Sequence, residues 1–527
     1  MSDDGGTTRD HAGTGEAAPG PWPPRVVPRR EGDDADLARV TAVVRDGPFS
    51  DAWESLTSGY SAPPWYQDAK FGIFVHWGVY SVPAFRNEWY ARTMYLEGSP
   101  EYDHHVATHG PQAEFGYKDF IPRFHGERFD AQEWVRAFRR AGAQFVVPVA
   151  EHHDGFAMYD TARSRWKAPL MGPRRDVIGE LATATRDAGM VFGVSSHRAE
   201  HWWFMNGGSR FDSDVRDPEF ADFYGPAMRE ETAPNEQFLE DWLLRTVEVI
   251  DRYRPQVLWF DWWVEQPAFE PYLRRLAAYY YNQADRWGRG VVINHKWSAF
   301  RAGAAVYDIE RGSMAEIRPD VWQNDTAVSK VAWCWVDGHR YKSVADLVAE
   351  LADVVAKNGV LLLNVGPKPD GTIAEEEQLL LDGLGDWLNI NGEAIYGTRP
   401  WVIPGEGPTQ NAAGSFVDDG RKAYTAADVR FTTRTDVTGL YLYAILLGRS
   451  ADGVARIRSL GRASGLLPHG FDRVELLGHR DADGLSWERD DDYLAIRLPP
   501  ESSHLGAVVK VPLSSPSPQP RVDFLHG

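Results

Sequence analysis

Short apolar runs recur along residues 71–363, and most of them are followed at once by polar or charged residues. The run at 145–149 leads into Glu151, His152, His153 and Asp154, and the run at 257–260 leads into Asp261. Eight buried parallel strands with chemistry at their carboxyl ends are typical of an α/β fold, the (β/α)8 barrel. The predicted strands are 71–77, 145–149, 191–194, 257–260, 291–293, 304–307, 331–335 and 360–363.

Amphipathic segments lie between several of these runs, as expected for helices that cover a barrel. One connection does not fit, because the chain between Lys296 and Ala304 is too short for a crossover helix. We therefore expect an irregular barrel. The predicted helices are 131–141, 177–188, 236–253, 271–287 and 344–357.

The pattern changes after Trp401, where helical periodicity stops and short alternating segments separated by Gly, Asp and Pro begin. This predicts a β-sandwich over residues 397–527, behind a catalytic barrel over 39–396. The sandwich lacks a clear aromatic platform, so we expect it to have a structural or oligomeric role. Residues 1–38 are rich in Gly, Pro, Asp and Arg, a composition that predicts a disordered tail.

The chain carries 56 Lys and Arg against 76 Asp and Glu, a formal charge of −20. This charge argues against nucleic acid or an anionic membrane as partner.

Cys334 is the single cysteine, in an apolar setting that indicates packing. With no signal peptide and no apolar run long enough to span a bilayer, we expect a cytoplasmic protein. We expect no cofactor, and a homo-oligomer remains open.

Asp261 lies between Trp259 and Trp262-Trp263 at the end of an apolar run. Aromatic rings stack on the C–H faces of a sugar, and an ionised carboxylate there can meet the positive charge that develops at the anomeric carbon. The alternative interpretation is a core strand that ends in a helix-capping Asp.

Four long motifs, in order, resemble the α-L-fucosidases of glycoside hydrolase family 29. They are the block from Trp65 to Ala84 with Asn87-Glu88-Trp89-Tyr90, the block Glu151 to Phe156, the strand Leu258 to Asp261, and the block Lys357 to Pro367. The resemblance spans about Trp65 to Trp401. It implies a barrel followed by a β-sandwich, and retaining hydrolysis of terminal α-L-fucosyl residues of oligosaccharides or glycoconjugates.

The resemblance places the nucleophile at Asp261. In this family the acid/base lies in a variable segment, and we predict Glu310, which follows the sixth apolar run and should reach the same face of the barrel. Glu316, on a loop that could fold over the site, is the second candidate, and Glu265 is the third.

Sugar-binding residues can also be carried over by motif. His76, Glu88, Trp89, His152 and His153 match positions that hydrogen-bond the hydroxyls of fucose, and Phe74 is expected either to cover its methyl group or to pack in the core.

The sequence departs from the family pattern at two places. His197 or Arg198 stands where relatives carry a tyrosine-containing stretch, and Lys296 stands where an arginine is common. A lysine lacks the bidentate fork of arginine, so other L-sugars such as α-L-galactosides remain possible substrates.

Two alternatives to a metal-free glycosidase stay open. Asp103-His104-His105 and Glu151-His152-His153-Asp154 resemble metal-ligand clusters, but adjacent histidines on an extended segment point to opposite sides, so we predict no metal. A non-catalytic sugar-binding protein on a glycosidase barrel is the second alternative, and loss of hydrolysis with retained fucose binding would identify it.

Overall fold

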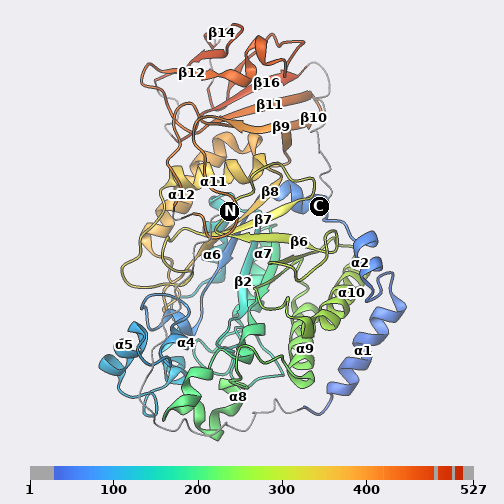
Figure 1. The fold of residues 1–527 in the computed structure, drawn as a ribbon, viewed down its shortest axis with the longest axis vertical. Coiled ribbons are helices and arrows are strands. Elements are labelled where there is room, and N and C mark those ends of the chain that lie inside the picture. Colours follow the sequence, from blue (N-terminus) through green and yellow to red (C-terminus); the bar gives the residue numbers. More distant parts are fainter. Residues whose placement is uncertain (1–28, 419, 480–484, 501–504, 514–527) are drawn as a thin grey trace, which may run out of the picture.

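The computed structural model describes residues 29–418, 420–479, 485–500 and 505–513. In it, a barrel and a smaller all-β domain lie end to end (Figure 1).

Eight parallel strands close into the barrel in chain order, and β8 pairs with β1. This confirms the predicted (β/α)8-type fold. The strands are β1 (Phe71–Val75), β2 (Phe145–Glu151), β3 (Val191–Ser196), β4 (Val257–Phe260), β5 (Val292–His295), β6 (Val306–Glu310), β7 (Trp322–Ala327) and β8 (Gly359–Val365).

All five predicted helices are confirmed, with ends within one residue of the prediction. Local capping explains their sharp starts: Asp130 accepts a hydrogen bond from the Glu133 amide, and Asn235 accepts one from the Phe238 amide. These helices are α6 (Ala131–Arg140), α7 (Val177–Asp187), α9 (Glu236–Tyr253), α10 (Glu270–Trp287) and α11 (Val344–Ala356). The other α-helices are α1 (Asp33–Asp46), α2 (Trp53–Gly59), α3 (Pro64–Ala69), α4 (Tyr90–Thr93), α5 (Pro100–His109), α8 (Ala221–Tyr224) and α12 (Glu375–Asn391).

The barrel is irregular at the predicted place. Strand β5 passes to β6, and β6 to β7, without an intervening helix in this fully described part of the chain. Loops take the place of helices on this side of the barrel, and they place Trp297 and Arg311 at its mouth.

The predicted seventh strand at 331–335 is wrong, because β7 is Trp322–Ala327. This strand was missed because its side chains are polar although they are fully buried. Several of them find partners on other elements: Gln323 accepts a hydrogen bond from Tyr66 and donates one to Asp308, and Thr326 accepts one from Lys342. Ala332 and Cys334 of the 331–335 segment pack instead in a small cluster with Tyr80.

The C-terminal domain is a β-sandwich, as predicted. One sheet has the order β13-β16-β11-β10-β9 and the other β12-β15-β14, around an apolar core that includes Trp401, Phe431 and Ile496. The strands are β9 (Arg399–Glu406), β10 (Val429–Asp436), β11 (Gly439–Leu446), β12 (Val454–Ile457), β13 (Glu475–Leu476), β14 (Trp487–Arg489), β15 (Leu494–Arg497) and β16 (Val508–Leu513).

Residues 1–28 of the predicted tail lie outside the described residues, as do parts of the sandwich range. The last part of the tail is helical, since α1 begins at Asp33. It packs against α10, and Asp33 and Asp36 pair with Arg163 at 2.7 and 2.6 Å. None of the helices in the described ranges has the length and apolar character needed to cross a membrane.

Candidate active site

A cavity of about 560 Å³ opens at the carboxyl ends of the barrel strands, within the usual size range of ligand pockets. Nine of the predicted site residues line it: His76, Glu88, Trp89, His152, His153, His197, Asp261, Lys296 and Glu310. Four predicted candidates do not line it, and one of them, Arg198, is described below. Phe74 is fully buried beneath the floor, Glu316 is exposed on the loop after β6, and Glu265 is half-buried beyond β4.

Asp261 follows β4 directly and is held by three donors. The Trp262 amide donates to Oδ1 at 2.9 Å, His197 Nδ1 lies 2.8 Å from Oδ2, and Lys296 Nζ lies 3.1 Å from Oδ1. Burial by itself raises the pKa of this carboxyl, but the Lys296 charge and the His197 hydrogen bond outweigh it and hold the pKa well below its usual range. Asp261 is therefore ionised at neutral pH.

Lys296 bridges Asp261 and Glu310. Its Nζ lies 3.1 Å from Asp261 Oδ1 and 2.5 Å from Glu310 Oε2. Because both oxygens touch one nitrogen, their separation cannot exceed the sum of these distances. That limit lies near the about 5 to 5.5 Å spacing of retaining glycosidases, well short of the about 6.5 to 9.5 Å of inverting ones.

Two further carboxyls lie beneath this lysine and were not predicted from the sequence. Asp325 Oδ2 is 3.6 Å from Lys296 Nζ, and Asp308 accepts hydrogen bonds from Trp259 and Gln323 at 3.1 and 2.7 Å. Burial raises the pKa of both Asp308 and Asp325, and the charge of Asp308 raises that of Asp325 further. Asp325 therefore keeps its proton to a higher pH than an ordinary carboxyl does. A correct assignment of β7 would have revealed Asp325.

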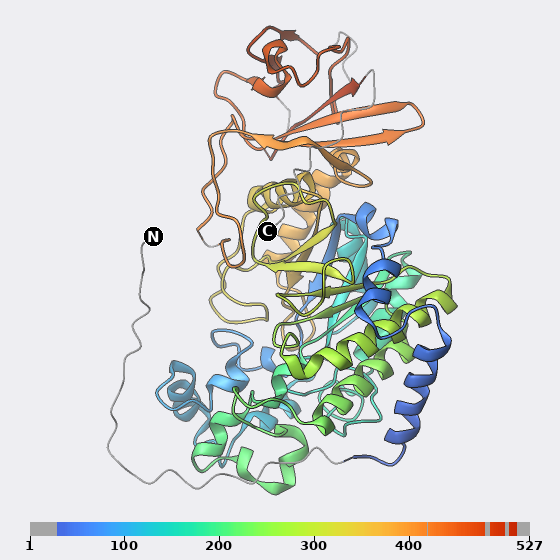
Figure 2. The same cartoon turned by 45° about the vertical axis from the view of Figure 1, so that its right-hand side comes forward.

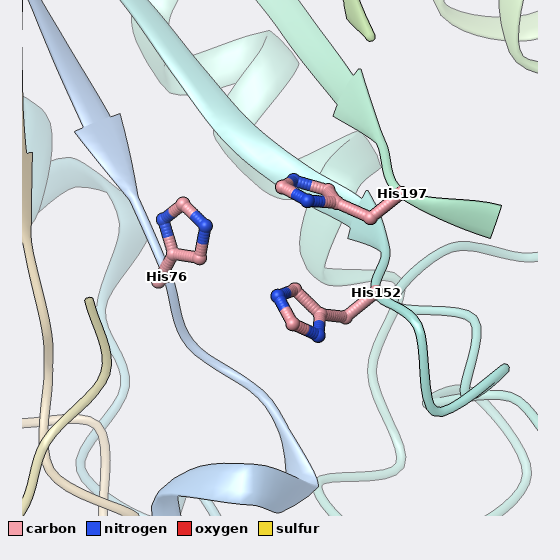
Figure 3. A group of neighbouring side chains, drawn as sticks. All are labelled: His76, His152 and His197. Carbon is pink, nitrogen blue, oxygen red and sulfur yellow. The ribbon is translucent and has the colours of Figure 1, made fainter. Parts of the chain in front are cut away.

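Three histidines from adjacent strand ends face one another across the cavity floor: His76 after β1, His152 after β2 and His197 after β3 (Figure 3). Burial lowers the pKa of all three, that of His197 to about 4. A neutral imidazole can donate through one nitrogen and accept through the other. His197 already uses both nitrogens, toward Asp261 and Ser195, so it offers less to a hydroxyl group than the other two rings. Within the described residues, the Nδ1 atom of His152 has no hydrogen-bond partner.

His153 differs from these three because it has a buried counter-ion. Its Nδ1 lies 3.3 Å from Glu200 Oε2, and its Nε2 lies 3.6 Å from Asp261 Oδ2. Burial lowers its pKa, but these two carboxylates outweigh burial and raise the pKa to about 9. Glu200, on the loop after β3, was not singled out from the sequence.

Indole rings form the walls. Trp89 and Trp262 stack with centroids 6.5 Å apart, and Trp259 lies under Lys296 Nζ at 4.8 Å. Glu88 is buried and accepts a hydrogen bond from the Trp333 amide at 3.0 Å. Phe74 packs edge-on against Trp259, with centroids 5.0 Å apart. The structure thus places Phe74 behind the wall, so the predicted methyl contact gives way to the core-packing alternative.

Arg198 does not reach the cavity, so of the two residues predicted to replace the family's tyrosine contact, His197 lies in the site. Arg198 is buried in an ion-pair network: it contacts Asp241 at 2.7 Å and Glu151 at 2.5 Å, and Arg245 contacts the same two carboxylates. This network fixes the end of β2 against the loop after β3, where His152 and His197 begin.

Two groups in the described chain have ligand atoms close enough to hold a metal, His76-His152-His197 and His153-His197-Asp261. The argument that His152 and His153 point to opposite sides is wrong, because the chain turns after β2 and both line the cavity. However, both ring nitrogens of His197 already bind partners, Asp261 at 2.8 Å and Ser195 at 3.0 Å. A metal would have to displace one of them.

Two closely spaced carboxylates between indole walls, at the carboxyl end of a barrel, are an arrangement typical of glycoside hydrolases. The sequence model of the alpha-L-fucosidase family matches residues 37–393. The chain belongs to this family.

Individual relatives agree. Human plasma alpha-L-fucosidase is 30% identical over 475 residues, which cover 86% of this chain and 90% of the relative. Tissue alpha-L-fucosidase of Rattus norvegicus is 31% identical over 372 residues, covering 68% and 74%. The crystal structure of Thermotoga maritima alpha-fucosidase in complex with fucose is similar with a TM-score of 0.69 and 29% identity, over 88% of this chain and 100% of that one.

The prediction of a cytoplasmic location is wrong on this comparison, because the matching relatives are named for plasma and for tissue. That prediction relied on the signal-peptide and membrane-span patterns of the sequence. Cys334 is fully buried beside Tyr80, so its thiol serves packing and reports nothing about the compartment.

Proposed function

We propose that this α-L-fucosidase is a retaining exo-glycosidase that releases terminal α-L-fucosyl residues from oligosaccharides or glycoconjugates by double displacement. The observation that carries the proposal is the single ammonium of Lys296 between two carboxylates, Asp261 and Glu310, at the floor of the cavity. A pair this close leaves no room for a water molecule between a carboxylate and the anomeric carbon, so the first attack comes from the protein.

Asp261 is the nucleophile in this mechanism. Its low pKa keeps it ionised, and its donors leave the carboxylate facing the cavity. Attack by an Asp261 oxygen on C1 forms a fucosyl ester as the bond to the leaving oxygen breaks. In the second step a water molecule attacks C1, and the ester bond breaks to return the carboxylate.

Glu310 is the acid/base. It protonates the leaving oxygen in the first step and takes a proton from water in the second. Its position at the end of β6, opposite Asp261 across Lys296, supports this role over Glu316, which lies outside the cavity. When Glu310 is protonated, its attraction to the Lys296 ammonium is weaker, because the carboxyl then carries no negative charge.

The neutral histidines supply the hydroxyl contacts. His76, with Nδ1 fixed by Asn364 at 2.7 Å, leaves Nε2 for the sugar, and the free Nδ1 of His152 is a second such atom. Glu88 is a fixed acceptor nearby. A rigid set of this kind suits a neutral polyol, and Trp89 and Trp262 suit its apolar face.

The roles can be tested with an aryl α-L-fucoside whose leaving group needs little acid. Asp261→Ala should abolish turnover, and a 2-fluorinated fucosyl inactivator should label the peptide that contains Asp261. Glu310→Ala should lose turnover that added azide partly restores, with a fucosyl azide as product. Glu316→Ala is the matched control, and restoration at Glu316 but not at Glu310 would reverse the assignment. Native protein that binds fucose but turns over no faster than Asp261→Ala would be the non-catalytic sugar-binding protein.

A further inference from the structure

Among the Phe, Trp and Tyr side chains in the described ranges, only Trp297 and Phe416 fall in the exposed class, at 48% and 59%. Both line the same cavity as Asp261 and Glu310. Val331, a third exposed apolar residue, lines it too at 39%. Large apolar side chains left in water and gathered at the rim of a polar cavity mark a binding surface.

Phe416 reaches the barrel from the sandwich side of the chain, on the segment between β9 and β10. Figure 2 shows this orange segment running from the sandwich down beside the barrel. The Phe416 amide donates to the Glu310 carbonyl at 2.8 Å, and the Val417 amide donates to the Arg311 carbonyl at 3.0 Å. Ser313 and Gly414 exchange two more hydrogen bonds, at 3.2 and 2.9 Å. The main chain that carries Phe416 is therefore fixed to the residue that we assign as the acid/base.

Trp297 is tied to Lys296, the residue that bridges Asp261 and Glu310, because it follows Lys296 directly in the chain. Trp297 and Phe416 both have left-handed backbones, with φ of 51° and 57°. For bulky residues this conformation is strained and is kept where the surroundings impose it. Trp297 also borders a second cavity, of about 520 Å³, lined by Phe300, Tyr307 and Met314.

We propose that Trp297 and Phe416 form the subsite for the leaving group, and that this subsite takes a pyranose ring of a glycan. The inference rests on the proposed function. The oxygen that receives the proton must reach Glu310, so the sugar attached to that oxygen lies beside Phe416. A pyranose presents C–H faces to these rings and its hydroxyls to water. On this proposal the sandwich side of the chain contributes to substrate choice, in addition to the structural or oligomeric role expected from the sequence.

The test compares two substrates that share the fucosyl group. α-L-Fucosyl fluoride has no sugar to place in the subsite, whereas an α-L-fucosyl disaccharide has one; the disaccharide used is the one that the wild type cleaves best among different linkages. For Trp297→Ala and for Phe416→Ala, we expect kcat/KM on the disaccharide to fall about five- to tenfold more than kcat/KM on the fluoride. Phe416→Tyr, which keeps an aromatic ring, should retain most of the wild-type kcat/KM on the disaccharide. Leu379→Ala, another exposed apolar residue, on α12, is the control.

Each outcome is decisive. A selective loss of kcat/KM on the disaccharide, caused mainly by a higher KM, supports the subsite. Equal losses on both substrates, or no loss on either, overturn it while leaving the fucosidase assignment intact. A wild type that cleaves the fluoride but no disaccharide also overturns it. A wild type that cleaves neither substrate would refute the proposed function and the subsite together.

Discussion

Replacing Lys296 with methionine gives the sharpest prediction of the mechanism. The substitution keeps most of the buried aliphatic stem and removes the ammonium that lies 3.1 Å from Asp261, 2.5 Å from Glu310 and 3.6 Å from Asp325. It leaves the two reacting carboxylates side by side with no cation between them. Like charges this close favour protonation of one of the pair.

The size of the effect follows from the distance. Two unit charges about 3.1 Å apart attract by roughly 5 kcal/mol at an effective dielectric constant of about 20. Lys296 shares its charge among three carboxyls, so we expect a net loss of about 3 kcal/mol of transition-state stabilisation, or a fall in kcat/KM of about 100-fold.

Asp261 works only when ionised, so activity falls as the pH drops through its pKa. Loss of the ammonium raises that pKa, and the acidic limb of the profile moves to higher pH.

The assay is the pH dependence of kcat/KM on an aryl α-L-fucoside. Lys296→Arg, which keeps the charge, should retain an acidic limb close to that of the wild type. Lys357→Met is the matched control, since Lys357 is also a buried lysine and pairs with Asp353 at 2.8 Å away from the cavity. An acidic limb of Lys296→Met that coincides with the wild-type limb would refute the electrostatic role of this lysine.

Other parts of the structure give four further predictions. Asp241→Asn removes a carboxylate shared by two buried arginines and should lower the free energy of unfolding in a denaturant titration by about 3 to 5 kcal/mol; a change under about 1 kcal/mol would contradict the network. Gly312→Ala places a Cβ 2.1 Å from the Gly414 carbonyl oxygen, so it should lower Tm and disaccharide cleavage, whereas Gly420→Ala, in open space, should do neither. Glu200→Gln should lower the pKa of His153 from about 9, seen by NMR titration of the imidazoles, and an unchanged value would exclude Glu200 as its counter-ion. Dialysis against a chelator should leave activity intact, because His197 has both ring nitrogens engaged, and loss restored by zinc would show the opposite.

The sequence predicted most of the barrel because its signals are local. Amphipathic periodicity and N-caps determine where α6 and α9 begin, and apolar runs mark β1, β2, β4 and β8. Strand β7 was not predicted, because the rule that buried strands are apolar fails where polar side chains find hydrogen-bond partners inside the protein. Gln323 and Asp325 sit inside the barrel as part of a network with Asp308, and that network is visible only once the strands are neighbours.

For the site, motif matching placed nine side chains around the cavity, since the residues that follow strand ends must converge on one face. It could not find Glu200 or Asp325, whose importance arises from burial and from the charge of a neighbour. It also could not find Phe416. This residue is 155 positions from Asp261 in the chain, and nothing local to it indicates that its segment pairs with the end of β6.

That pairing has a consequence for engineering. Production of the barrel alone as a minimal catalyst would require a cut between α12 and β9. Such a truncation would remove the main-chain amides that donate hydrogen bonds to the carbonyls of Glu310 and Arg311. Grafting sandwiches from other family members onto this barrel would instead exchange the segment beside the proton donor. If the proposed subsite holds, libraries that vary residues 407–418 within the intact chain are a route to altered glycan selectivity that leaves the histidines of the cavity floor untouched.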